Sequence, residues 1–60
     1  MFTAYVTTKT GKITLRTMPR KRRDVEETAV SMSKTPDVAR VSVAAYGRII
    51  AAFKDGVRVE

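Results

Sequence analysis

The sequence has no cysteine, no histidine and no tryptophan, and only three glycines and two prolines among its 60 residues. Without cysteine the chain can form neither a disulfide nor a cysteine-based zinc site. Histidine, the commonest metal ligand and a frequent general base, is missing too. The six acidic residues are scattered along the chain and do not cluster. These absences predict a protein that holds no metal and no cofactor.

The sequence also lacks a recognisable catalytic constellation. A hydrolase without His or Cys needs paired carboxylates or a Ser activated by Lys. The carboxylates fall at a predicted helix start, in predicted turns and at the last residue, and the glycines stand alone and do not form a phosphate-binding loop. We therefore expect a protein that is not an enzyme.

Long apolar runs are absent as well. A membrane-spanning helix needs about 20 consecutive apolar residues, and no stretch approaches that length. The first residues, MFTAYVTTKTGK, alternate between apolar and polar and do not form the apolar core of a signal peptide. We expect a cytoplasmic protein without membrane contact.

The length supports one domain, 1–60, with a small core. A chain this short buries only about 60% of the surface that its unfolded form exposes. Such scaffolds are usually stabilised by disulfides, a metal or a partner chain. With the first two excluded, a well-packed monomer or an oligomer remains, and we predict a homodimer.

Positive charge is concentrated in the first part of the chain. The net charge is +6, but residues 1–23 carry +7 with no acid at all, whereas residues 24–60 carry −1. An asymmetry of this kind indicates an acidic partner, such as nucleic acid, a membrane surface or an acidic protein.

Residues 2–17 alternate at period two, which predicts a pair of half-buried strands. Thr10-Gly11 is the expected turn. The pairing around it would set Val6 opposite Leu15, and would put Tyr5 and Arg16 on the other face. In this register one face of the hairpin collects all the apolar side chains: Ala4, Val6, Ile13 and Leu15.

Residues 19–34 change to a helical period, with apolar side chains at i, i+4 and i+7: Val25, Ala29 and Met32. Asp24 and Glu27 resemble a capping box, which would start the helix at Asp24. Alternatively, Pro19 occupies the first turn of a longer helix. Pro36 ends the helix in either case, because the residue before a proline avoids the helical conformation.

Residues 38–53 predict a second hairpin that turns at Tyr46-Gly47 and sets Val41 opposite Ala52 and Val43 opposite Ile50. Asp55-Gly56 is a further tight-turn signal, so residues 57–59 form a short fifth strand or a loose tail. The fold class is α+β, in the order β-β-α-β-β, with one helix packed on one face of an antiparallel sheet.

One helix leaves the other sheet face uncovered. In the predicted registers, that face carries Ile49, Ala51 and Phe53, and Tyr46 lies at the adjoining turn. An exposed apolar patch usually marks an interaction surface. These four residues are the predicted oligomer or partner interface, formed either by stacking of two sheets or by pairing along a sheet edge.

The strongest functional signal is the run Arg20-Lys21-Arg22-Arg23 at the start of the predicted helix. Four cations repel one another and oppose the helix dipole, so folding alone does not explain them. Release of counterions from phosphates would favour them. The alternative is a solvated helix start in which Arg22 pairs with Glu26 and Arg23 with Glu27 at i, i+4.

Four more residues extend this candidate nucleic-acid site: Tyr5, Lys9, Lys12 and Arg16. Tyr5 and Arg16 would be neighbours on the uncovered face, where an aromatic ring and a cation could hold a single strand by stacking and phosphate contact. Along the second predicted strand and the residues after it, an extended chain separates Lys12 from Arg20 by roughly 27 Å at about 3.3–3.4 Å per residue. The basic residues therefore do not form one compact patch in a single chain.

Two segments, SKTPDVARVSV and GRIIAAF, resemble small proteins of phages and other mobile elements. In those proteins a hairpin, a helix ending near Lys-x-Pro, a Val-rich strand and a Gly-Arg turn follow one another. The resemblance implies an accessory protein of a group that includes nucleic-acid binders and inhibitors of host enzymes. It assigns no functional residue to this chain, and the basic run departs from the neutral or acidic helix entry of similar proteins.

Two functions follow as expectations, and a small structural or assembly protein is a third alternative. The first is a small, non-enzymatic DNA- or RNA-binding protein that contacts phosphates through residues 20–23. The second is an inhibitor or regulator that docks on an acidic host protein through the face from Ile49 to Phe53 or through a sheet edge.

Overall fold

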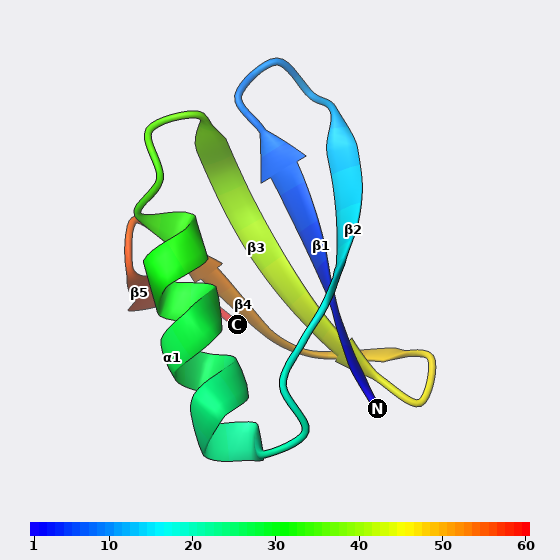
Figure 1. Cartoon of the computed structure of the whole chain (residues 1–60). Helices are drawn as coiled ribbons and strands as arrows, with labels where there is room; N and C mark the ends of the chain where they lie inside the picture. The colour runs from blue at the N-terminus through cyan, green and yellow to red at the C-terminus, as the bar shows by residue number, and fades with distance from the viewer.

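The computed structural model describes all 60 residues and has two layers, one helix and one antiparallel sheet (Figure 1). The sheet has five strands in the order β2-β1-β3-β4-β5. The predicted α+β fold is confirmed, and of the two alternatives for residues 57–59 the short fifth strand is the one that forms. The elements in chain order are β1 (Phe2–Thr8), β2 (Ile13–Thr17), α1 (Arg22–Ser33), β3 (Val38–Ala45), β4 (Arg48–Lys54) and β5 (Val57–Arg58).

The first hairpin differs by one residue from the predicted register. Val6 lies opposite Thr14, and Leu15 lies opposite Tyr5. The expected two-residue turn is replaced by a longer one: the Gly11 N–H donates to Thr8 O, and the Thr8 N–H donates to Lys12 O across a loop of residues 9–11. Gly11 has φ +89°, the left-handed conformation that closes three-residue hairpin loops.

This shift exchanges the two faces of β2. Ile13 and Leu15 were predicted to lie in the core, but they lie on the uncovered face, opposite Thr7 and Tyr5, and are exposed. Arg16, which was predicted to lie on the uncovered face, lies opposite the buried Ala4 and so on the helix side.

The second hairpin is also shifted by one residue, and a bulge is the cause. Tyr46 and Gly47 form the predicted turn, both with positive φ, and Ala44 pairs with Ile49 as that turn requires. The register then shifts between Val43 and Ala44, so that Val43 lies opposite Ala51 and not opposite Ile50. The inserted residue rotates the rest of β4 to the other face.

The bulge decides what lies under the helix. Ala51 and Phe53, predicted to lie on the uncovered face, are part of the core, and Phe53 is only 4% exposed. Ile50 packs against the same core from the bulge. The wrong prediction came from continuing a regular strand through position 50.

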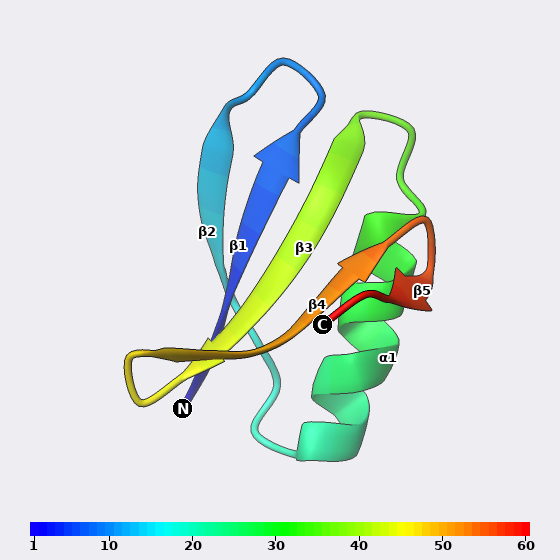
Figure 2. The same cartoon turned by 180° about the vertical axis from the view of Figure 1, so that it is seen from behind.

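The helix begins at Arg22, so neither predicted start, at Asp24 or with Pro19 in its first turn, is right. It packs across β3 and β4, touches β1 and β5, and makes no contact with β2 (Figure 2). Val25 and Ala29 are buried as predicted, and Met32 is partly buried. The core also takes in Met18 from the connection between β2 and α1.

Ser33 links the end of the helix to the turn between β4 and β5. Its buried hydroxyl donates to Val30 O at 2.8 Å and accepts the backbone N–H of Gly56 at 2.8 Å. Gly56 and Asp55 both have positive φ in the predicted Asp-Gly turn. The hydroxyl thus holds the β4–β5 turn on α1.

We predict that Phe53→Ala lowers the free energy of unfolding by about 3–5 kcal/mol, because it opens a cavity beneath α1. Ile49→Ala, on the same strand but 52% exposed, should cost about 1 kcal/mol or less. Urea denaturation followed by circular dichroism measures both. Equal losses would contradict the bulged register.

We predict that Ser33→Ala lowers the free energy of unfolding by about 1–3 kcal/mol, because it leaves the Gly56 N–H without its acceptor. Ser31→Ala is the matched control, since Ser31 is exposed on the same helix and alanine favours helix. Thermal unfolding of both variants should show a clear drop in Tm for Ser33→Ala alone.

Candidate nucleic-acid interface

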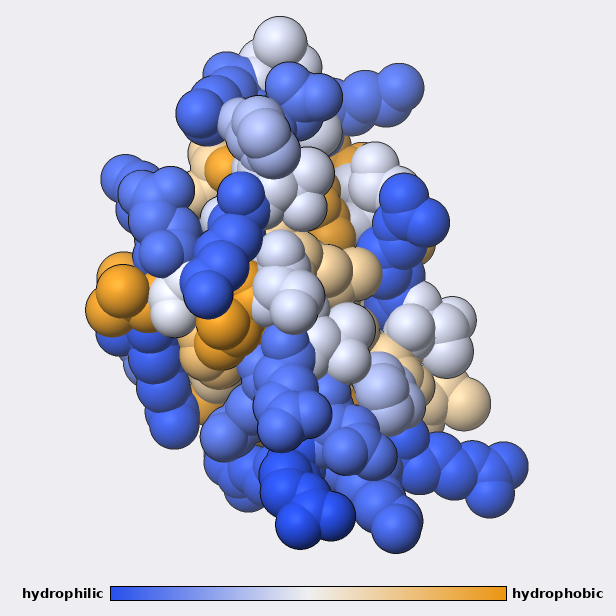
Figure 3. Space-filling model, turned by 60° about the vertical axis from the view of Figure 1, so that its left-hand side comes forward, coloured by the Kyte–Doolittle hydropathy of each residue, from blue (hydrophilic) through white to orange (hydrophobic).

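The basic run lies at the end of the molecule where α1 begins. Lys21 is the N-cap residue, with extended backbone, and Arg22 and Arg23 form the first helical turn. All four cations from Arg20 to Arg23 are exposed. Figure 3 shows hydrophilic side chains gathered at this lower end of the molecule.

None of these cations forms an ion pair with an acid. The i, i+4 pairs of Arg22 with Glu26 and of Arg23 with Glu27 are not formed, and the structure's one ion pair joins Arg40 to Glu60. No carboxylate of the chain therefore neutralises the charge of the run. The alternative reading, in which half the run is neutralised by its own helix, lacks those contacts.

The helix start adds to the positive potential of this end. Lys21 provides no side-chain cap for the first turn, and the first N–H groups of any helix lack intrahelical partners. The positive end of the dipole lies there as well. Asp24 is the one acid of the first turn and offsets part of this potential.

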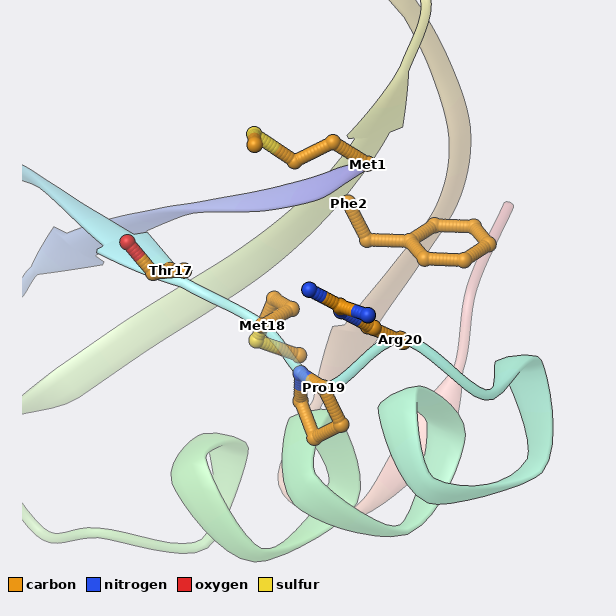
Figure 4. Close-up of a pocket in the computed structure, with 6 residues that line it drawn as sticks. All are labelled: Met1, Phe2, Thr17, Met18, Pro19 and Arg20. Carbon is orange, nitrogen blue, oxygen red and sulfur yellow. The ribbon is translucent and has the colours of Figure 1, made fainter.

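An open pocket of about 480 Å³ adjoins the run (Figure 4). Met1 and Phe2 contribute from the start of β1, and Arg20 contributes from the connection to α1, with its guanidinium pointing back towards the strands. The remaining lining residues are Thr17, Met18 and Pro19. An aromatic and apolar lining beside a cation is suited to an unstacked base next to its phosphate. Sequence reasoning missed this pocket because its two segments are far apart in the chain.

Lys9 and Lys12 lie at the opposite end of the molecule. The Lys9 N–H donates to Asp37 O at 2.9 Å, just beyond the C-terminal end of α1, while the basic run lies at its N-terminal end. A helix of twelve residues spans about 18 Å at 1.5 Å per residue. The expectation that the basic residues do not form one compact patch in a single chain is confirmed (Figure 1).

Tyr5 and Arg16 do not form the predicted stacking surface. Tyr5 lies opposite Leu15 on the uncovered face, whereas Arg16 lies opposite Ala4 on the helix side. The one-residue shift of the hairpin separates them. Arg16 instead lies on the same side of the sheet as α1, near the end of β2 that leads into the basic run.

The predicted partner interface is divided in the same way. Tyr46 and Ile49 are exposed at the β3–β4 hairpin, with Tyr46 93% exposed, while Ala51 and Phe53 are buried under α1. The large apolar side chains that the uncovered face does expose on β2 are Ile13 and Leu15. A glycine at the third position of the first loop was the signal that could have identified them.

Comparisons of this chain with protein-family models, with curated proteins and with solved structures found no match. The helix of the structure is too short and too polar to cross a membrane.

Proposed function

We propose that this protein binds nucleic acid without catalysing a reaction, and that Arg20, Lys21, Arg22 and Arg23 contact its phosphates. The observation that carries the proposal is that these four exposed cations share the positive end of α1 and pair with no carboxylate. Clustering four cations adds little to the stability of the folded chain. In a complex with a polyanion, the same cations can form a set of charge-assisted hydrogen bonds with its phosphates.

The proposed contact is with the backbone more than with bases. Phosphate contacts fix orientation, and sequence is read by side chains that reach base edges. The exposed face of α1 carries Glu26 and Glu27, which would be repelled along a groove lined by phosphates. We therefore expect weak sequence preference, with the helix end and not the helix side facing the ligand.

The affinity should fall steeply with salt. If four cations each replace a counterion on a duplex, the logarithmic slope is about −0.9 per contact, so raising salt from about 50 to 200 mM weakens binding roughly a hundredfold. Fluorescence anisotropy with labelled duplex and single-stranded DNA and RNA measures this slope. Preference for single strands would implicate the pocket beside Arg20.

Charge reversal tests the residues themselves. Arg22→Glu with Arg23→Glu should abolish binding, and it should not unfold the chain, because acids are favourable in the first turn of a helix. The matched control reverses Arg48 and Lys54, which are exposed and lie outside the proposed site, so the net charge changes equally. Equal losses in both double variants would mean that only net charge matters and would contradict the assignment.

A second candidate function is docking on an acidic host protein as an inhibitor or regulator, in line with the resemblance to phage accessory proteins. The observation that favours it is the exposed pair Tyr46 and Ile49 at the β3–β4 hairpin.

Substitution of this exposed pair distinguishes the two proposed functions. Tyr46→Ser with Ile49→Ser should leave nucleic-acid affinity within about twofold of wild type, because neither side chain belongs to the proposed phosphate contacts and surface substitutions usually change stability by only about 0.5 kcal/mol. A large loss of nucleic-acid affinity, measured by fluorescence anisotropy, would place the hairpin in the nucleic-acid interface.

A further inference from the structure

The strand β2 is an unprotected edge of the sheet. It pairs on one side with β1, and α1 makes no contact with it (Figures 1 and 2). Four of its five residues are exposed. Unpaired edge strands present a row of free backbone groups to another strand.

The free backbone groups and the exposed apolar side chains of β2 belong to the same residues. Thr8 N–H donates to Lys12 O at 2.8 Å, and Met18 N–H donates to Phe2 O at 3.2 Å. Bonded and non-bonded pairs alternate along an antiparallel ladder. Ile13, Leu15 and Thr17 therefore direct their N–H and C=O groups outward.

Ile13 and Leu15 also expose their side chains on the uncovered face, by 60% and 62% respectively. We propose that a second copy of this chain pairs antiparallel along this edge, with Leu15 opposite the partner's Leu15. The two sheets then form one continuous sheet, and both helices lie on the same face of it because the two-fold axis is perpendicular to the sheet.

The charges on β2 select this register. Centred on Leu15, the pairing places Ile13 opposite the partner's Thr17 and Arg16 opposite the partner's Thr14, so no like charges lie directly opposite. Centred on Thr14, it places Lys12 opposite the partner's Arg16, and centred on Arg16 it places two arginines opposite each other. Like charges directly opposite are destabilising.

The pairing builds one surface from two copies, and this step rests on the proposed function. Thr14 and Arg16 face the helix side, over a part of the sheet that α1 leaves bare. Diagonal neighbours on adjacent strands are about 7–8 Å apart, so Arg16 and the partner's Arg16 meet between the two helices. A bound nucleic acid neutralises them, and by linkage its binding strengthens the dimer.

The absence of cysteine makes disulfide trapping a clean test. Directly opposite residues of a bonded pair have Cα atoms about 5.5 Å apart, within the range of a disulfide. Leu15→Cys should therefore form a covalent dimer in a glutathione redox buffer without nucleic acid. The matched control is Ile13→Cys, equally exposed but about 13 Å from the partner's Ile13 at four residues along the strand, which should stay monomeric.

The register has a second check. The double variant Ile13→Cys with Thr17→Cys should crosslink, because the pairing sets these positions opposite each other, and Thr14→Cys should not. Crosslinking of Thr14→Cys in place of Leu15→Cys would overturn the proposed register. Equal crosslinking of Leu15→Cys and Ile13→Cys would indicate random collision and overturn the proposal.

Sedimentation equilibrium of the wild-type chain is the independent measurement. The edge is short, and small interfaces are typical of weak complexes, so we expect dimer to appear as the concentration approaches about 1 mM. A monomer throughout, with Leu15→Cys not crosslinked, overturns the proposal and leaves the edge to a strand of another protein.

Nucleic-acid binding is scored separately on the crosslinked Leu15→Cys dimer. Adding Arg16→Glu there should weaken binding at least tenfold, whereas in a monomer held by Leu15→Ser it should weaken it less. If the dimer forms but binds no nucleic acid, the edge pairing stands and the proposed function fails. If the chain binds nucleic acid but forms no dimer, the proposed function stands and the edge pairing fails.

Discussion

The packing of α1 across β3 and β4 is the interaction on which the rest of the structure depends. Val25 and Ala29 on the helix cover Val41 and Val43, which are fully buried, together with Phe53. A helix of twelve residues cannot cover five strands, so it lies over the middle strands and leaves β2 bare. The limited contact area between α1 and the sheet therefore explains both the buried core under the helix and the uncovered edge strand.

The same packing places the basic run at one end of the molecule. The helix must start close to the end of β2, because only the short connection of residues 18–21 separates them, and Met18 is drawn into the core. Arg22 and Arg23 are then held on the rigid first turn of α1, next to Arg20 and Lys21, with the dipole adding to their potential. Positioning by a helix reduces the conformational entropy lost when a polyanion binds.

The sequence was a good guide to the order and type of elements and to the tight turns, because hydrophobic periodicity and Gly-containing turns are local signals. It misplaced both hairpin registers by one residue. Gly11 closes a longer loop than the simplest turn, and Ile50 enters as a bulge. Each costs little locally, yet each exchanges the faces of all residues beyond it, which is why Leu15 and Phe53 were assigned to the wrong sides.

The sequence by itself determined that the chain is a small α+β domain with seven cations and no acid before Asp24. These facts need only composition and period. The tertiary structure alone decided which side chains share a face: Arg16 with the helix, Leu15 with Tyr5, Phe53 with the core, and Phe2 with Arg20 around one pocket. Side-chain faces depend on pairing between distant strands, and that pairing is chosen by how well the whole core packs rather than by any local pattern.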